Sequence, residues 1–194
     1  MVGRGNPPFL LFMIEQREAC KVLIEHFKGK NIVGAEIGVC RGNHAMSLLQ
    51  NLPNLYLHLV DNGVEMFHID TDNSVKFLWE LGCELKPVLG TTVKWHIKNS
   101  VEASTEIEDT SLDFVYIDAG HDFLDVRRDC EVWYPKVKVG GVICGHDYMP
   151  SIGDDVRRAV DGFFTKEQKQ VFSARNEEDG NEKFRHIFDW VVFK

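Results

Sequence analysis

Four polar residues that could carry acid–base or metal chemistry follow two apolar runs in the second half of this 194-residue chain. Asp118 ends the first run and His121 comes three residues later, whereas His146 and Asp147 follow the second run after one glycine. Carboxylate oxygens and imidazole nitrogens can together hold a divalent cation, and a cation next to a hydroxyl group lowers the pKa of that hydroxyl. A histidine, with an ordinary pKa of about 6.5, could accept the released proton. The pattern therefore indicates a site that could deprotonate an alcohol.

Two predicted strands, 112–117 and 139–144, would position these residues, and an amphipathic helix is predicted over 123–137 between them. A strand–helix–strand unit makes the two strands parallel neighbours, whose carboxyl ends lie about 5 Å apart. Ligands bind at that edge of open parallel sheets, so the sequence predicts one shared site. The structural alternative is a helix cap at Asp118, a solvated His121 and a polar loop after the second strand.

A glycine-punctuated turn follows an earlier predicted strand, 31–37, in the segment EIGVCRG (36–42). Glycines there allow a close approach of the backbone to a ligand, and the next helix, predicted from His44 with Asn43 as its cap, presents unpaired N–H groups. Asp61 ends the next strand, where a carboxylate can bind ribose hydroxyls. The fingerprint GxGxxG of nicotinamide enzymes is absent, because Cys40 and Asn43 occupy two of its glycine positions.

The rest of the chain alternates helices and strands and ends in a hairpin, which predicts an α/β sandwich with a mainly parallel sheet. We treat residues 1–194 as a single domain, with residues 1–30 as an N-terminal lead and a helix that covers the cofactor cleft or contacts a second subunit in a homodimer. Further helices are predicted at 9–27, 44–49, 73–85, 101–107 and 152–164, and further strands at 55–60, 93–97, 170–174 and 184–193.

Composition excludes several classes of protein. The formal net charge of −8 and the absence of a Lys/Arg-rich block disfavour nucleic-acid binding. The apolar run 9–14 is too short to span a membrane. Five scattered cysteines without a CxxC pair are typical of reduced thiols in a cytoplasmic protein.

The turn after the first strand resembles the first motif of class I S-adenosylmethionine-dependent methyltransferases, Asp/Glu-x-Gly-x-Gly-x-Gly. Glu36, Gly38 and Gly42 match that motif, and Cys40 departs from it at the middle glycine. The resemblance implies a Rossmann-like sandwich of seven strands with a C-terminal antiparallel hairpin. It implies that the turn faces the amino-acid part of the cofactor, that Asp61 binds the ribose and that the adenine lies near residues 99–100. The implied cofactor-binding residues are Glu36, Gly38, Cys40, Gly42, Asp61, Asn99, Ser100 and Asp118.

The pattern IDAGH…GGVICGHDY (117–148) is similar to a narrower group, the metal-dependent O-methyltransferases that act on sugars of macrolide and aminocoumarin antibiotics. This resemblance implies a small-molecule hydroxyl as acceptor, His121 as general base beside Asp118, and a divalent cation held by Asp118, His146 and Asp147. His146 stands where those enzymes usually have Asp or Glu. Two carboxylates and an imidazole suit Mn²⁺, Fe²⁺ or Zn²⁺ better than Mg²⁺.

Two other functions remain open at this point: a metal-independent methyltransferase acting on nitrogen or a carboxylate, and a non-catalytic protein that keeps the cofactor-binding fold. The sequence does not identify the acceptor, the metal or the oligomeric state. We interpret the remaining histidines as packing or surface residues. The charged residues of the helix 123–137, Asp125 and Asp129 among them, are predicted to form its solvated face.

Overall fold

The computed structural model describes residues 17–40, 42–63, 93–148, 154–166, 168–174 and 187–194. The predictions for residues 1–16, which include the first half of the predicted helix 9–27, for the helix 73–85 and for the first residues of the last strand lie outside this part of the chain. Seven strands form one sheet in the order β3-β2-β1-β4-β5-β7-β6. They are β1 (Ile32–Ile37), β2 (Leu55–Val60), β3 (Val93–His96), β4 (Leu112–Ile117), β5 (Val137–Gly145), β6 (Lys169–Ala174) and β7 (Ile187–Phe193).

Strands β1 to β5 run parallel to one another, and the last two strands close the sheet as an antiparallel pair. β7 pairs with β5, so the C-terminal hairpin occupies the edge next to the strand that carries His146 at its end. The Rossmann-like, mainly parallel sheet with a C-terminal hairpin is thereby confirmed.

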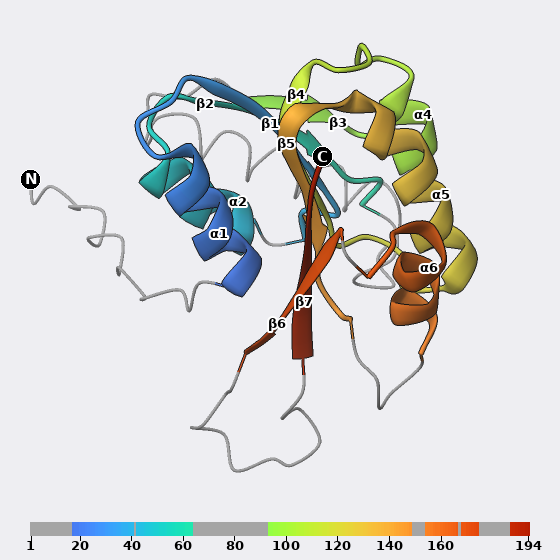
Figure 1. Ribbon diagram of the computed structural model, residues 1–194. Coiled ribbons are helices and arrows are strands. Elements are labelled where there is room, and N and C mark those ends of the chain that lie inside the picture. Colours follow the sequence, from blue (N-terminus) through green and yellow to red (C-terminus); the bar gives the residue numbers. More distant parts are fainter. Residues whose placement is uncertain (1–16, 41, 64–92, 149–153, 167, 175–186) are drawn as a thin grey trace, which may run out of the picture.

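Helices cover both faces of the sheet (Figure 1). One face carries α1 (Glu18–Phe27) and α2 (Asn43–Asn51), and the other carries α4 (Ser100–Ser104), α5 (Phe123–Trp133) and α6 (Asp155–Phe163). None of the described helices is long and apolar enough to cross a membrane.

The core consists of two apolar layers that the sheet separates. Leu23 of α1 and Leu48 of α2 are buried with Phe114 on one face of the sheet. Trp133 of α5 and Val160 of α6 are buried on the other face. These layers follow from the strand sequences, in which neighbouring side chains point to opposite faces and both faces are apolar.

Three local predictions were wrong. Gly42, not Asn43, caps α2: Gly42 adopts φ 73°, a conformation that glycine enters without steric cost, and Asn43 is the first residue of the helix. The helix predicted to run to residue 137 ends at Trp133 and continues as a 3-10 turn, Tyr134–Lys136, because proline at residue 135 cannot extend an α-helix. β5 consequently begins at Val137, two residues before its predicted start.

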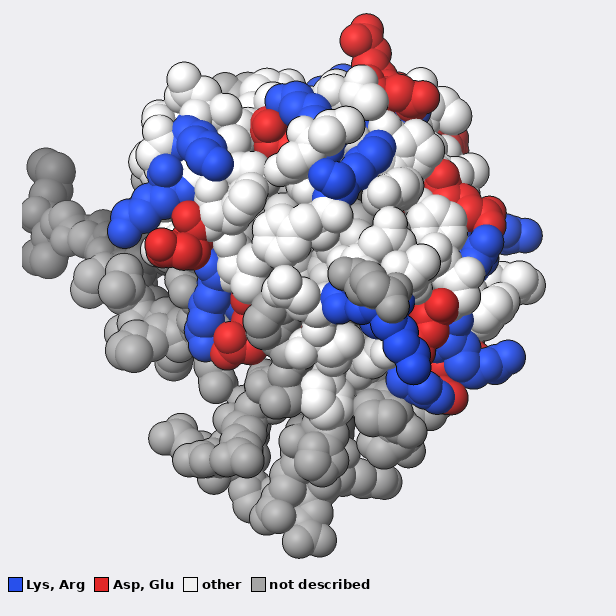
Figure 2. All heavy atoms as spheres, in the orientation of Figure 1, with Lys and Arg blue, Asp and Glu red and all other residues white. Residues whose placement is uncertain are grey.

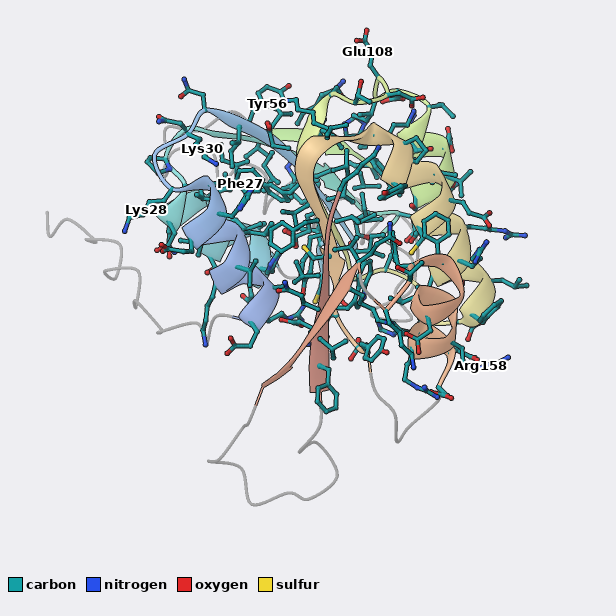
Figure 3. All side chains as sticks on the ribbon, in the orientation of Figure 1. Phe27, Lys28, Lys30, Tyr56, Glu108 and Arg158 are labelled. Atoms are coloured by element: carbon teal, nitrogen blue, oxygen red, sulfur yellow. The ribbon has the colours of Figure 1, made fainter. Side chains whose placement is uncertain are left out.

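The two edges of the sheet carry different residues. Lys30, Tyr56 and Glu108 lie around the edge where β1, β2 and β4 begin, which is the upper edge in Figure 3. The polar residues predicted to do chemistry follow the other ends of the strands. The parallel topology therefore gathers them at one edge.

Candidate active site

A cavity of about 700 Å³ lies at the carboxyl ends of the parallel strands. This volume is in the range of sites for cofactors and drug-sized ligands. Of the residues predicted from the sequence to bind cofactor or metal or to act in catalysis, Glu36 and Gly42 do not line it. The predicted residues that do line it are Gly38, Cys40, Asp61, Asn99, Ser100, Asp118, His121, His146 and Asp147.

The glycine turn is held against β4 and β2. Gly38 has φ 86° and lies so close to β4 that a Cβ there would be 2.1 Å from the carbonyl oxygen of Asp118. The Oδ2 atom of Asp61 accepts hydrogen bonds from the backbone N–H groups of Val39 and Cys40, at 2.8 and 3.1 Å. Its Oδ1 atom accepts one from Gly63 at 2.7 Å. Asp61 thus fixes the turn, and Gly38, Cys40 and Asp61 all line the cavity.

Glu36 lies behind the turn rather than in the cavity wall. The residue is 1% exposed, and its Oε2 atom is 3.2 Å from Nδ1 of His44. The His44 ring stacks on Tyr116, with 3.7 Å between the ring centres. Burial alone would lower the pKa of His44, but the charge of Glu36 raises it to about 9. This buried pair therefore joins α2 to the strand beneath the site.

Asp118, His121 and Asp147 form a compact cluster at the ends of β4 and β5. His121 Nε2 is 3.0 Å from Oδ2 of Asp147 and 3.7 Å from Oδ1 of Asp118. One ligand atom from each of the three side chains lies within 4.8 Å of the other two, close enough to share an ion. Asp147 adopts φ 55°, a strained conformation for a non-glycine residue that is common at functional sites.

His146 lies beside this cluster. Its Nδ1 atom is 3.2 Å from Oδ1 of Asp147 and 3.9 Å from Oδ1 of Asp118. Its Nε2 atom is 3.7 Å from Oδ1 of Asp189, a buried carboxylate on β7. The cluster that could share an ion thus includes His121, which was predicted as the base, whereas the role of His146 as a ligand stays a prediction.

The charges of the cluster shift its pKa values. The carboxylate of Asp118, and then that of Asp147, raises the pKa of His121 to about 10, so without a cation the imidazole is protonated at neutral pH. Burial alone would raise the pKa of Asp118, but His121 and Arg17 hold it below its usual value. Burial would likewise raise the pKa of Asp147, but His121 and His146 lower it below its usual value.

Arg17 was missed in the sequence. Its guanidinium, just before α1, forms an ion pair with Oδ2 of Asp118 and donates a hydrogen bond to the Tyr116 hydroxyl at 2.7 Å. Because 101 residues separate Arg17 from Asp118, no local pattern could have revealed this contact. It places a permanent positive charge in the cavity wall.

Asp129 was also missed, and the prediction that it lies on a solvated face was wrong. The side chain is 4% exposed, lines the cavity and forms a hydrogen bond with the Ser100 hydroxyl. The sequence held a signal: Asp129 lies at helical spacing between Val126, Cys130 and Trp133, the buried apolar stripe of α5.

The cavity fits the cofactor and the cation that the resemblance implies. A turn with positive φ at Gly38, Cys40 and Gly42 presents backbone to a ligand, and the carboxylates of the cavity wall suit a positively charged sulfonium. Two carboxylates and an imidazole within reach of one point are ligands for a divalent cation.

Comparison with known proteins gives a consistent result. A family model described as a methyltransferase domain matches residues 35–148. An rRNA methylase from Streptococcus thermophilus has the same fold, with a TM-score of 0.65 at 10% identity over 91% of this chain and 93% of that one. A precorrin-6y C5,15-methyltransferase from Geobacter metallireducens gives a TM-score of 0.61 at 13% identity over 91% and 89% of the two chains. A TDP-rhamnose 3′-O-methyltransferase of calicheamicin biosynthesis gives 0.60 at 10% identity over 90% and 76%.

A sequence relative matches only locally. An uncharacterised protein of Sinorhizobium fredii is 40% identical over 50 residues, which are 26% of this chain and 6% of that protein. The match therefore spans a small part of a much longer protein.

Proposed function

We propose that this chain methylates a hydroxyl group on a small molecule. The chain belongs to the methyltransferase-domain family and is a class I S-adenosylmethionine-dependent methyltransferase. The observation that carries the proposal is that Asp118, His121 and Asp147 converge on the wall of the cavity that the glycine turn and Asp61 also line. An acid–base cluster next to a cofactor cavity is what an oxygen nucleophile requires.

We assign the cofactor to the part of the cavity near β1 and β2. The backbone at Gly38 and Cys40 would hold its amino-acid portion, Asp61 would hold the ribose, and the wall around Asn99 and Ser100 would hold the adenine. When bound, S-adenosylmethionine supplies an electrophilic methyl group on a positively charged sulfur. Glu36 acts from behind the turn, through its buried contact with His44.

In the proposed reaction, the acceptor oxygen forms a bond to the methyl carbon as the carbon–sulfur bond breaks, and the bonding electron pair stays on sulfur. Nε2 of His121 receives the hydroxyl proton. This nitrogen can do so only when it is neutral, and Asp118 and Asp147 together keep it protonated in the absence of other charges. A base in this position therefore needs its carboxylate neighbours to be neutralised.

A divalent cation would supply that neutralisation. We assign it to Asp118 and Asp147, with His146 as a further ligand, where it would offset the negative charge facing His121 and lower the pKa of the acceptor hydroxyl. Asp189 is 3.7 Å from Nε2 of His146, so it would orient this imidazole from behind.

A small molecule is the acceptor that the surface favours. On the face shown in Figure 2, the basic side chains lie in separate groups, with acidic side chains close to several of them. With a formal net charge of −8, this surface does not favour a polyanion. A sugar or polyketide-like hydroxyl is the class we propose, and the likeness in fold to a TDP-rhamnose 3′-O-methyltransferase supports this choice.

A metal-independent methyltransferase acting on nitrogen or a carboxylate is the second candidate, and Arg17 is the observation that favours it. Its guanidinium already places a positive charge on Asp118 without any metal. In that case Asp118 and Arg17 would together orient the acceptor.

The test is methyl transfer from isotope-labelled S-adenosylmethionine to a panel of hydroxylated sugars and polyketides, before and after chelation and with Mn²⁺ added back. We expect chelation to abolish transfer and Mn²⁺ to restore it. Activity that chelation leaves unchanged would reject the cation and favour the second candidate.

On an identified acceptor, His121→Ala is expected to lower kcat by about a hundredfold or more while cofactor binding is kept. His26→Ala is the matched control, because His26 lies on α1 outside the cavity lining. Near-normal turnover by His121→Ala would show that the base is another group.

A further inference from the structure

Asp129 is a buried carboxylate that faces the same end of the cavity as Asn99 and Ser100. It projects from α5, whereas those two residues begin α4, so two elements meet at this part of the wall. Burial raises the pKa of Asp129 to about 6, so at neutral pH the group is ionised and can only accept hydrogen bonds. A buried carboxylate is costly unless donors surround it.

The two residues predicted to contact the adenine already use their hydrogen-bonding atoms within the protein. The side-chain oxygen of Asn99 caps α4 by accepting a hydrogen bond from the N–H of Glu102 at 2.9 Å. The Ser100 hydroxyl accepts a hydrogen bond from Nε1 of Trp133 at 2.7 Å and donates its single proton to Oδ1 of Asp129. Both residues therefore form part of the cavity wall, but their side-chain oxygens already have hydrogen-bond partners within the protein.

The relay from Trp133 through Ser100 fixes the orientation of the Asp129 carboxylate. Among the described residues, Ser100 is the hydrogen-bond donor to this group, and its proton goes to Oδ1. The second oxygen is thereby left to accept from a ligand in the cavity. A group with N–H donors at the edge of a flat ring would satisfy it.

We propose that Asp129 is a specificity-determining residue that accepts a hydrogen bond from the exocyclic amino group of the cofactor's adenine. The inference rests on the cofactor site proposed above and adds to it the group that recognises the base. Ser100 and Trp133 are positioning residues, because they act through Asp129.

This assignment predicts discrimination between purines. Adenine has an amino group at the position where hypoxanthine has a carbonyl oxygen. A carboxylate attracts the amino group and repels the carbonyl, and a buried acceptor that faces another acceptor loses its hydrogen bond. In Asp129→Asn, the Ser100 proton can still bond to the side-chain oxygen, which leaves the amide N–H₂ to face the ligand. That donor suits hypoxanthine and opposes adenine.

The experiment is calorimetric titration of S-adenosylhomocysteine and S-inosylhomocysteine into the wild-type protein, Asp129→Asn and Glu131→Gln at neutral pH. Glu131→Gln is the matched control, because it makes the same acid-to-amide change on α5 at an exposed side chain that pairs with Arg127. Thermal unfolding without ligand reports whether each variant is folded.

We expect the wild-type protein and Glu131→Gln to bind the adenosyl compound more tightly, and Asp129→Asn to lower that preference by about tenfold or more. The loss should fall on the adenosyl compound alone. An unchanged preference in Asp129→Asn, or an equal loss for both compounds, would overturn the assignment. A wild-type protein that bound neither compound would overturn the cofactor site as well.

Discussion

Replacement of Gly38 by alanine should damage both the fold and the cofactor site, and Gly140 offers a matched control. The two glycines have nearly the same backbone conformation, with φ 86° and 82°. A Cβ at Gly140 would meet nothing within 4 Å, whereas a Cβ at Gly38 would lie 2.1 Å from the carbonyl oxygen of Asp118 and 2.5 Å from its carbonyl carbon. The pair therefore separates the cost of backbone conformation from the cost of the contact.

The magnitudes follow from these contacts. An alanine in the left-handed region costs about 1–2 kcal/mol, which is the whole effect expected for Gly140→Ala. At Gly38 the contact must also open from 2.1 Å to the 3.4 Å at which ordinary packing begins, and both partners are backbone. Forced overpacking adds about 1–3 kcal/mol, so we expect Gly38→Ala to be less stable than Gly140→Ala by about 2 kcal/mol.

Urea unfolding followed by circular dichroism measures the stabilities, and calorimetry with S-adenosylhomocysteine measures binding. Gly38→Ala should weaken binding by about tenfold or more, because the movement displaces the turn and Asp118 together. Gly140→Ala should bind normally, since Gly140 lies near the start of β5 and its N–H bonds to Lys194. Equal stability and equal binding for the two variants would refute the close packing of the turn on β4.

Three further predictions concern charge. Burial raises the pKa of Asp129 from 3.8 to about 6, so the folded state binds this proton more tightly and loses stability as the pH rises through that interval. The stability of Asp129→Asn relative to the wild type, measured by urea unfolding, should therefore rise by about 3 kcal/mol between pH 3 and pH 7. A difference that does not change with pH would contradict the burial of the carboxyl group. Glu36 raises the pKa of His44 from 6.5 to about 9 against the effect of burial. The protonated imidazole therefore stabilises the folded state fully below pH 6.5, and this stabilisation is lost as the pH rises through 9. The loss of unfolding free energy caused by His44→Gln, measured in the same way, should shrink by about 3 kcal/mol from pH 6 to pH 10. Millimolar Mn²⁺ should raise the melting temperature of the wild type but not that of Asp147→Asn. Asparagine tolerates the positive φ of this position, so the variant should keep the local backbone. An equal rise in both proteins would place the cation elsewhere.

The sequence predicted the strands better than the contacts between them. The bounds of β2 and β4 matched the prediction, because each apolar run ends abruptly on an aspartate, Asp61 or Asp118. The gathering of residues at the carboxyl ends followed from the parallel topology alone. The cap of α2 was misjudged because Gly42 takes a left-handed conformation there, which side-chain preferences at Asn43 do not report.

The contacts that sequence reasoning missed join distant segments. Arg17 reaches Asp118 from an element before the sheet, and Asp129 finds its partner in Ser100, 29 residues away. Such pairs depend on how the helices pack on the sheet. Hydrophobic periodicity predicts which face of a helix packs, but not which residue of another element each side chain contacts. Asp129 was the more predictable of the two, because an acid within an apolar stripe must find a buried partner or a ligand.

The most direct test of the proposed site is a crystal structure with S-adenosylhomocysteine and Mn²⁺, with data collected at a wavelength where manganese scatters anomalously. We predict the homocysteine portion beside the Gly38 turn, the ribose at Asp61, the adenine beside Asp129, and an anomalous peak between Asp118 and Asp147. Ligand bound outside this cavity would contradict the cofactor site. Bound S-adenosylhomocysteine without a manganese peak at Asp118 would reject the cation. It would favour the metal-independent reaction, in which Arg17 supplies the positive charge beside Asp118.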